Sequence, residues 1–221
     1  GNETTLTNNI SGYYSGTDIY NYYMNFEVEG TPYMLLALEY GANDDILAWA
    51  NDIVAQNNHR RVIVTTHGYM NYDGTTLDGD DNAAPKPTGT TNENYLKYNN
   101  GDEMWDEFVR KHANIIMVLS GHVDYNNIVM REDIGDHGNT VHQFLIDPQK
   151  MDRAYGFETG MVAMLYFRNG GKDVSVEYVS TYKTANNEGK EVLFNGRNQF
   201  DFTIKEAPAE ASKGEINVWL I

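Results

Sequence analysis

Two histidines stand at the ends of apolar, β-branched runs, where a buried strand stops and a metal ligand is well placed. His67 ends the run VIVTTH, and His122 follows IMVLSG. Glu39 lies at the corresponding end of PYMLLALEY, and Asp124 comes two residues after His122. Ligands of open α/β sheets collect beyond the carboxyl ends of parallel strands, so both imidazoles are expected to face one crevice. Imidazole and carboxylate oxygen together suit Zn, Mn or Fe, and these residues therefore predict a metal site.

The alternative is that each histidine makes only a structural hydrogen bond. His59 and His112 lie near the ends of predicted helices, where an imidazole interacts favourably with the helix dipole. His137 and His142 are expected to be structural or solvent-facing. The chain has no cysteine, which excludes thiolate sites, and it has no Gly-rich phosphate loop, G-x-S-x-G or His-Glu-x-x-His motif.

Length and charge limit the classes of protein to consider. A chain of 221 residues fits one domain that buries about 70% of its unfolded surface, and we assign residues 1–206 to that domain and 207–221 to a C-terminal tail. The net charge of -16 repels phosphate backbones, so nucleic acid binding is not expected. No apolar run reaches the ~20 residues of a membrane span.

The hydrophobic pattern predicts an α/β fold. Continuous apolar runs suggest strands buried on both faces, as in parallel sheets, and they alternate with segments of helical spacing. The expected order is strand 32–40, helix 44–58, strand 60–67, helix 101–112 and strand 114–122. Antiparallel strands are then predicted at 140–147, 161–169, 173–182 and 198–204, and short strands or irregular structure before residue 30.

The connection from Asn71 to Asn100 is longer than most loops and is expected to lie over the edge of the site. Its run DGDDNA, Asp78 to Ala83, is similar to the start of a calcium loop. Because Ala83 stands where that loop needs glycine, we do not expect calcium there.

Four blocks together resemble the C-terminal half of calcineurin-like metallophosphoesterases. These are VIVTTHGYM, GDEMWDEFVRKHANIIMVLSGHVD, DIGDHGNTVHQFLIDPQ and VSTY, within a match from about Tyr33 to Ile204. The resemblance implies a partial β-sandwich of two sheets flanked by helices, with two divalent ions (Mn, Fe or Zn) at the strand ends. Such ions activate water and neutralise phosphoryl oxygens.

The resemblance also assigns roles to three residues. His67 matches the lone histidine that binds the second metal, and His122 matches the first histidine of a Gly-His-x-His block that binds the same ion. Asp124 takes the place of the last histidine of that block, which normally binds the first metal. The upstream Asp-x-His, Gly-Asp-x-x-Asp and Gly-Asn-His-Asp/Glu motifs do not occur in this chain.

The main hypothesis is therefore that this chain is the C-terminal part of a phosphoesterase. The complete protein would bind divalent metal and act on phosphate mono- or diesters, and the chain alone would be inactive. This hypothesis predicts an apolar sheet edge where absent strands would pair, unless residues 1–30 or a second copy cover it. Alternatives are a non-catalytic binding module with the same architecture, or two chains that build one site between them. Zero cysteine, abundant Asn, Thr and Tyr, and the family's frequent export favour a periplasmic or secreted bacterial setting.

Overall fold

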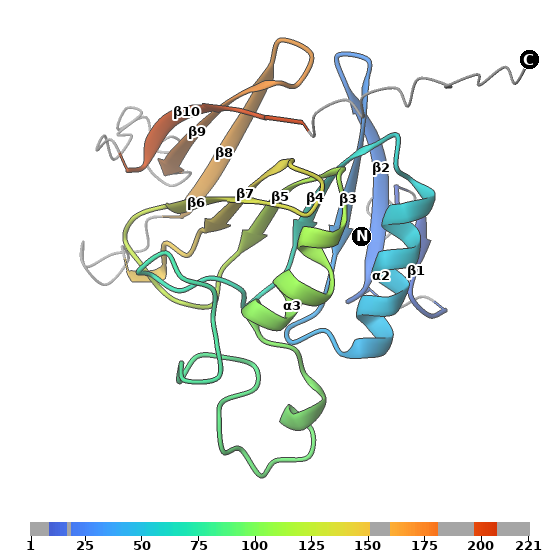
Figure 1. Ribbon diagram of the computed structural model, residues 1–221. Coiled ribbons are helices and arrows are strands. Elements are labelled where there is room, and N and C mark those ends of the chain that lie inside the picture. Colours follow the sequence, from blue (N-terminus) through green and yellow to red (C-terminus); the bar gives the residue numbers. More distant parts are fainter. Residues whose placement is uncertain (1–8, 17–18, 151–159, 181–196, 207–221) are drawn as a thin grey trace, which may run out of the picture.

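The chain folds into three layers (Figure 1). The computed structural model describes residues 9–16, 19–150, 160–180 and 197–206. A seven-stranded sheet forms the middle layer, with the helices on one face and a three-stranded sheet on the other. The predicted C-terminal tail 207–221 lies outside the described residues.

The large sheet mixes parallel and antiparallel pairing. Its strand order is β1-β2-β3-β4-β5-β7-β6, and β3, β4, β5 and β7 are parallel. The bounds are β1 Gly12–Tyr13, β2 Tyr22–Val28, β3 Thr31–Ala37, β4 Arg61–Thr65, β5 Ile115–Ser120, β6 Val129–Ile134 and β7 Thr140–Leu145. The predicted α/β class, with parallel strand-helix-strand units followed by antiparallel strands, is confirmed.

Both helices begin at capping asparagines. Asn43 accepts a hydrogen bond from the Ile46 amide at the start of α2 (Asp44–Gln56), and Asn100 forms a capping box with Glu103 at the start of α3 (Gly101–Glu107). The helix predicted over 101–112 stops earlier because Phe108 leaves helical geometry, and a 3-10 turn, η2 (Val109–Lys111), follows. The apolar faces of both helices pack on the parallel strands.

One strand was assigned the wrong direction and one was missed. Residues 140–147 were predicted to be antiparallel, but β7 pairs parallel with β5 and antiparallel only with β6. The neighbouring β6, VMREDI, was not predicted, because its charged residues interrupt the apolar pattern and none of its residues is fully buried. The β7 strand is buried along its whole length, as a strand covered on both faces must be.

The first thirty residues cover the edge of the parallel strands. β2 pairs antiparallel with all of β3, from Tyr22↔Ala37 to Val28↔Thr31. β1 then pairs with the first two residues of β2. β2 and β1 therefore cover the edge of the large sheet beside β3.

The small sheet has the order β10-β9-β8 and is antiparallel throughout. It comprises β8 (Met161–Arg168), β9 (Asp173–Ser180) and β10 (Gln199–Thr203). Val174, Val176 and Tyr178 of β9 are fully buried against the large sheet. The β8–β9 turn is fixed to the large sheet by the Tyr33 hydroxyl, which donates a 2.7 Å hydrogen bond to the Gly171 carbonyl.

A 3-10 turn, η1 (Tyr95–Lys97), interrupts the long connection between β4 and α3. Among the helices of the described residues, none has both the length and the apolar character needed to cross a membrane.

His142, on β7, is fully buried and serves a structural role. Its ring centroid lies 4.5 Å from that of Phe202, and its Nδ1 is 3.2 Å from Glu132 Oε1. Burial lowers the pKa of His142 below its ordinary value, although the nearby Glu132 carboxylate acts in the opposite direction and Lys205 adds to the lowering. The folded state therefore takes up this proton less readily than the unfolded chain does.

We expect acid to destabilise the fold partly through this residue. As the pH falls through the ordinary histidine range, the unfolded chain binds a proton that buried His142 does not, so the free energy of unfolding decreases. Denaturant titrations between pH 7.5 and 5.5 should show a smaller pH slope in His142→Gln than in the parent chain. An unchanged slope would contradict this role, and His59→Gln, at an exposed position, is the control.

Candidate functional site

The four parallel strands each present a candidate ligand at the same offset. These strands end at Ala37, Thr65, Ser120 and Leu145. Two residues after each end stand, in sheet order, Glu39, His67, His122 and Asp147. The carboxyl ends of parallel strands lie at the same edge of a sheet, so all four residues are expected at that edge.

His67 and His122 are brought into direct contact. His122 Nδ1 lies 3.1 Å from His67 Nε2, with the ring centroids 4.8 Å apart. Below them, the amide of Gly121 donates a 2.9 Å hydrogen bond to the His67 carbonyl, which extends the β4–β5 pairing up to the histidines. The juxtaposition predicted from the two strand ends is therefore present.

His122 has an unusual backbone. Its φ is +71°, and the Val123 amide donates to the Gly121 carbonyl at 2.9 Å. A hydrogen bond that spans one residue of positive φ is the rare γ-turn, which costs a residue other than glycine about 1–3 kcal/mol. The turn directs the imidazole back toward His67 instead of along the strand.

The distance between the two nitrogens is compatible with a shared metal ion. Two imidazole nitrogens bound to one zinc at about 2.0–2.1 Å stand roughly 2.9–3.4 Å apart when the bond angle is about 90–110°. The observed 3.1 Å falls in this interval. The described residues contain no group of three or more His, Cys, Asp or Glu side chains that could hold an ion. The histidine pair therefore brings together two potential ligands.

The surroundings of His122 disfavour its charged form. Burial, and then the proximity of His67, lower the pKa of His122, while the backbone hydrogen bond to Ala83 and then Asp147 act in the opposite direction. A neutral imidazole has the free lone pair that a metal requires. The direction of the shift is therefore compatible with metal binding.

Tyr40 and the long loop enclose the histidines on one side. The Tyr40 ring centroid lies 5.6 Å from that of His67 and 5.0 Å from that of His122. Its hydroxyl donates a 3.3 Å hydrogen bond to the carbonyl of Ala83, which also bonds to His122. The loop predicted to lie over the edge of the site does contact it at this residue.

Asp124 forms an ion pair with a lysine. Its carboxylate lies 3.4 Å from Lys150 Nζ, and the side chain is 31% exposed. The assignment of Asp124 as a metal ligand stays a prediction.

The sequence alone did not single out Asp147, which is the buried residue at the end of β7. If Gly121 carried a Cβ atom, that atom would lie 4.0 Å from Asp147 Oδ2. The Asp147 carboxylate therefore lies close to the residue that precedes His122. The backbone carbonyl of Asp147 accepts a 2.9 Å hydrogen bond from Tyr125. Once β7 is known to be parallel, the pattern of the other strand ends identifies Asp147 without further information.

Glu39, by contrast, is fixed mainly through its backbone. The Glu39 amide donates to Asn21 Oδ1 at 3.0 Å, and its carbonyl accepts from the Thr66 hydroxyl at 3.1 Å. These bonds join the N-terminal segment to the strand ends of the site.

A search against protein-family models finds no match. The chain is similar to the uncharacterized protein YvnB of Bacillus subtilis (strain 168), with 24% identity over 200 residues, which is 86% of this chain. The matched region spans only 14% of that protein's length.

We expect the histidine pair to give weak, specific zinc binding in this chain alone. Calorimetric titration with Zn²⁺ should show binding that is weakened at least about tenfold in His67→Ala/His122→Ala, because both ligands are lost. His59→Ala, which removes an exposed histidine near the opposite ends of the strands, should bind as the parent does. Equal binding by the parent and the double variant would contradict the assignment.

The γ-turn makes a separate prediction about stability. His122→Gly should be more stable than His122→Ala by about 1 kcal/mol, because only glycine adopts positive φ without strain. Both variants lack the imidazole, so their difference in free energy of unfolding isolates the backbone term. Equal stability, or a more stable alanine variant, would show that the turn is unstrained.

Proposed function

We propose that this chain is the C-terminal part of a calcineurin-like, metal-dependent phosphoesterase that hydrolyses phosphate mono- or diesters in the complete protein. The observation that carries the proposal is the 3.1 Å contact between His122 Nδ1 and His67 Nε2 at the ends of adjacent parallel strands. The order of the motifs around these histidines supports the family. The chain spans a small share of its curated relative, so the activity belongs to a longer polypeptide in this proposal.

The two histidines would hold one side of the metal centre. When bound there, divalent ions would activate a water molecule and neutralise charge on the phosphoryl oxygens. His67 and His122 would bind through the nitrogens that now face each other, and Asp124, whose Oδ1 pairs with Lys150, would contribute a carboxylate oxygen. The γ-turn and the Gly121–His67 hydrogen bond fix the two ligands before any ion arrives.

Further ligands are required because an open zinc site usually takes three protein ligands and this part of the chain brings two together. We assign the remaining ligands to the polypeptide encoded before residue 1. The chain alone should therefore be inactive, in agreement with the absence of the upstream motifs from its sequence.

Hydrolysis should appear only when the upstream polypeptide is present. The longer protein, incubated with Mn²⁺, Fe²⁺ or Zn²⁺, should hydrolyse p-nitrophenyl phosphate or bis(p-nitrophenyl) phosphate. His67→Ala and His122→Ala should each lower kcat/KM at least about 100-fold, since even residues that only support metal ligands contribute 10–100-fold. His59→Ala should leave the rate unchanged.

Two results would overturn the proposal. One is hydrolysis that persists in both histidine variants, which would place the active site elsewhere. The other is a longer protein that binds no metal and hydrolyses neither ester, which would favour the non-catalytic binding module. Activity that appears only on mixing two separate chains would support the site and identify its second half.

A further inference from the structure

A continuous path of aromatic rings leads from the histidine pair to the surface. The Tyr40 ring packs against both His67 and His122. The Tyr98 ring lies edge-on to Tyr40, with the ring centroids 6.2 Å apart, and the Tyr95 centroid lies 5.8 Å from that of Tyr98. Tyr95 is 42% exposed, so this tyrosine path, which consists of Tyr40, Tyr98 and Tyr95, opens to solvent at its outer end.

Two glycines make room for the close packing of these rings. A Cβ atom on Gly68, the residue after His67, would lie 2.8 Å from Cε2 of Tyr40. Gly41, the residue after Tyr40, has a φ of +65°, and a Cβ atom there would lie 2.8 Å from the Cβ of Tyr98. A side chain at either position would push the rings apart. The residues that follow Tyr40 and His67 are therefore of the type that the tyrosine path requires.

The outer part of the tyrosine path is fixed to the end of β3. Tyr95 begins η1, and the buried Asn99 follows this turn closely. Asn99 Nδ2 donates a 2.9 Å hydrogen bond to the Ala42 carbonyl, and the Asn99 amide donates to the Gly41 carbonyl at 3.4 Å. These bonds join the end of the long loop to the residues just after Tyr40. The rings are thus held together before any ligand binds, which lowers the entropic cost of binding.

The tyrosine path presents uncharged aromatic rings beside a polar site. Burial, and then the proximity of Tyr95 and Tyr98, raise the pKa of Tyr40, so its phenol stays neutral at neutral pH. Neutral aromatic side chains stack on planar rings, and this stacking tolerates different rings because each has a π face. A flat aromatic group therefore matches this surface better than a charged or branched one does.

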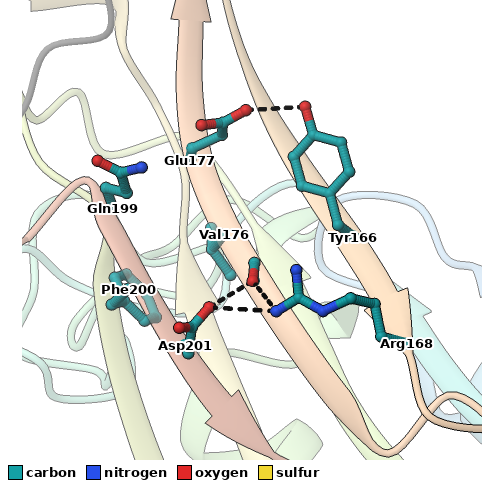
Figure 2. Close-up of a pocket in the computed structure, with 8 residues that line it drawn as sticks. Tyr166, Arg168, Val176, Glu177, Gln199, Phe200 and Asp201 are labelled. Carbon is teal, nitrogen blue, oxygen red and sulfur yellow. Dashed lines mark hydrogen bonds and ion pairs between the residues drawn. The ribbon is translucent and has the colours of Figure 1, made fainter.

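An exposed tyrosine on the small sheet provides a contrast. Tyr166 of β8 is 41% exposed and lines a hollow on the outer face of this sheet (Figure 2). Its hydroxyl donates a 2.8 Å hydrogen bond to Glu177, and Arg168 and Asp201 form an ion pair in the same hollow. Tyr166 thus lies among charged side chains, whereas each ring of the tyrosine path packs against another ring.

We propose that the tyrosine path binds the organic group of the phosphoester substrate, and that this group is planar and aromatic. The inference rests on the proposed function and names the substrate class of that site. With the phosphate at His67 and His122, the organic group would lie against Tyr98 and Tyr95. The net charge of -16 disfavours an organic group that carries further negative charge. The aromatic ring belongs either to an aryl ester or to the base of a nucleoside, and both offer the same stacking face.

The first test compares matched substrates in the longer protein with Mn²⁺. Benzyl phosphate and cyclohexylmethyl phosphate release alcohols of similar basicity, and only benzyl phosphate carries an aromatic ring. Tyr95→Leu/Tyr98→Leu should lower kcat/KM for benzyl phosphate about tenfold, mainly through KM, because stacking is lost. The cyclohexylmethyl ester should be nearly unaffected, and Tyr95→Phe/Tyr98→Phe should behave as the parent does. Tyr166→Leu, at a tyrosine exposed as much as Tyr95, is the control.

Adenosine 5′-phosphate distinguishes the two sources of the aromatic ring. A larger loss for this substrate than for benzyl phosphate in the leucine variant would support the proposal and assign the tyrosine path to a nucleoside. A larger loss for benzyl phosphate would support it and assign the path to an aryl ester. Equal losses for benzyl and cyclohexylmethyl phosphate, or no loss for any of the three substrates, would overturn the proposal.

Nuclear magnetic resonance measures binding of the organic group without hydrolysis, in this chain alone. The ring protons of Tyr95 and Tyr98 should shift on titration with benzylphosphonate, which carries no hydrolysable ester. Methylphosphonate, which lacks the ring, should leave them unchanged, and the Tyr166 ring should not respond to either compound. Equal shifts of Tyr95 and Tyr98 with both phosphonates, or shifts with neither, would contradict a surface that recognises an aromatic group.

The outcomes also separate this inference from the proposed function. Ring shifts specific to benzylphosphonate, together with a longer protein that hydrolyses no phosphoester, would support the aromatic binding surface and overturn the function. Metal-dependent hydrolysis that is lost in His67→Ala, but is the same in the parent and in Tyr95→Leu/Tyr98→Leu for every substrate, would do the reverse.

Discussion

The parallel pairing of β4 with β5 is the constraint on which the candidate site depends. Its hydrogen bonds continue beyond the strands, first from the Thr66 amide to the Leu119 carbonyl and then from the Gly121 amide to the His67 carbonyl. This register leaves His67 and His122 at the same height, and the γ-turn at His122 closes the remaining distance. A one-residue slip of β4 or β5 would move the histidine of the slipped strand to the other face of the sheet. His67 and His122 would then no longer be in contact.

Much of the framework that positions this pair could be predicted from the sequence. Continuous apolar runs followed by histidine identified β4 and β5, and the helical spacing behind Asn43 identified α2, because burial on both faces and capping leave local signals. His67 and His122 could be paired in advance since consecutive crossover units place their strand ends together. The strands that carry them are neighbours, as that prediction required.

Other features depend on information that no local window contains. The direction of β7 is set by its pairing with β5, and that pairing, not the composition of TVHQFLID, makes Asp147 a residue of the same edge. The exposed β6 lacks a clear apolar face and is held mainly by pairing with β7. The positive φ of His122 could not be predicted either, because only a few per cent of residues other than glycine adopt it, although histidine does so more often than most.

The two sheets differ in how their edges are protected. On the β3 side, β2 and β1 protect the large sheet, so the histidine pair rests on a buried, hydrogen-bonded support. Among the described residues, the small sheet ends in β8, whose outward side chains Val162 and Met164 are exposed. The histidine pair stands at the ends of β4 and β5, so its geometry depends on the large sheet and not on the small one.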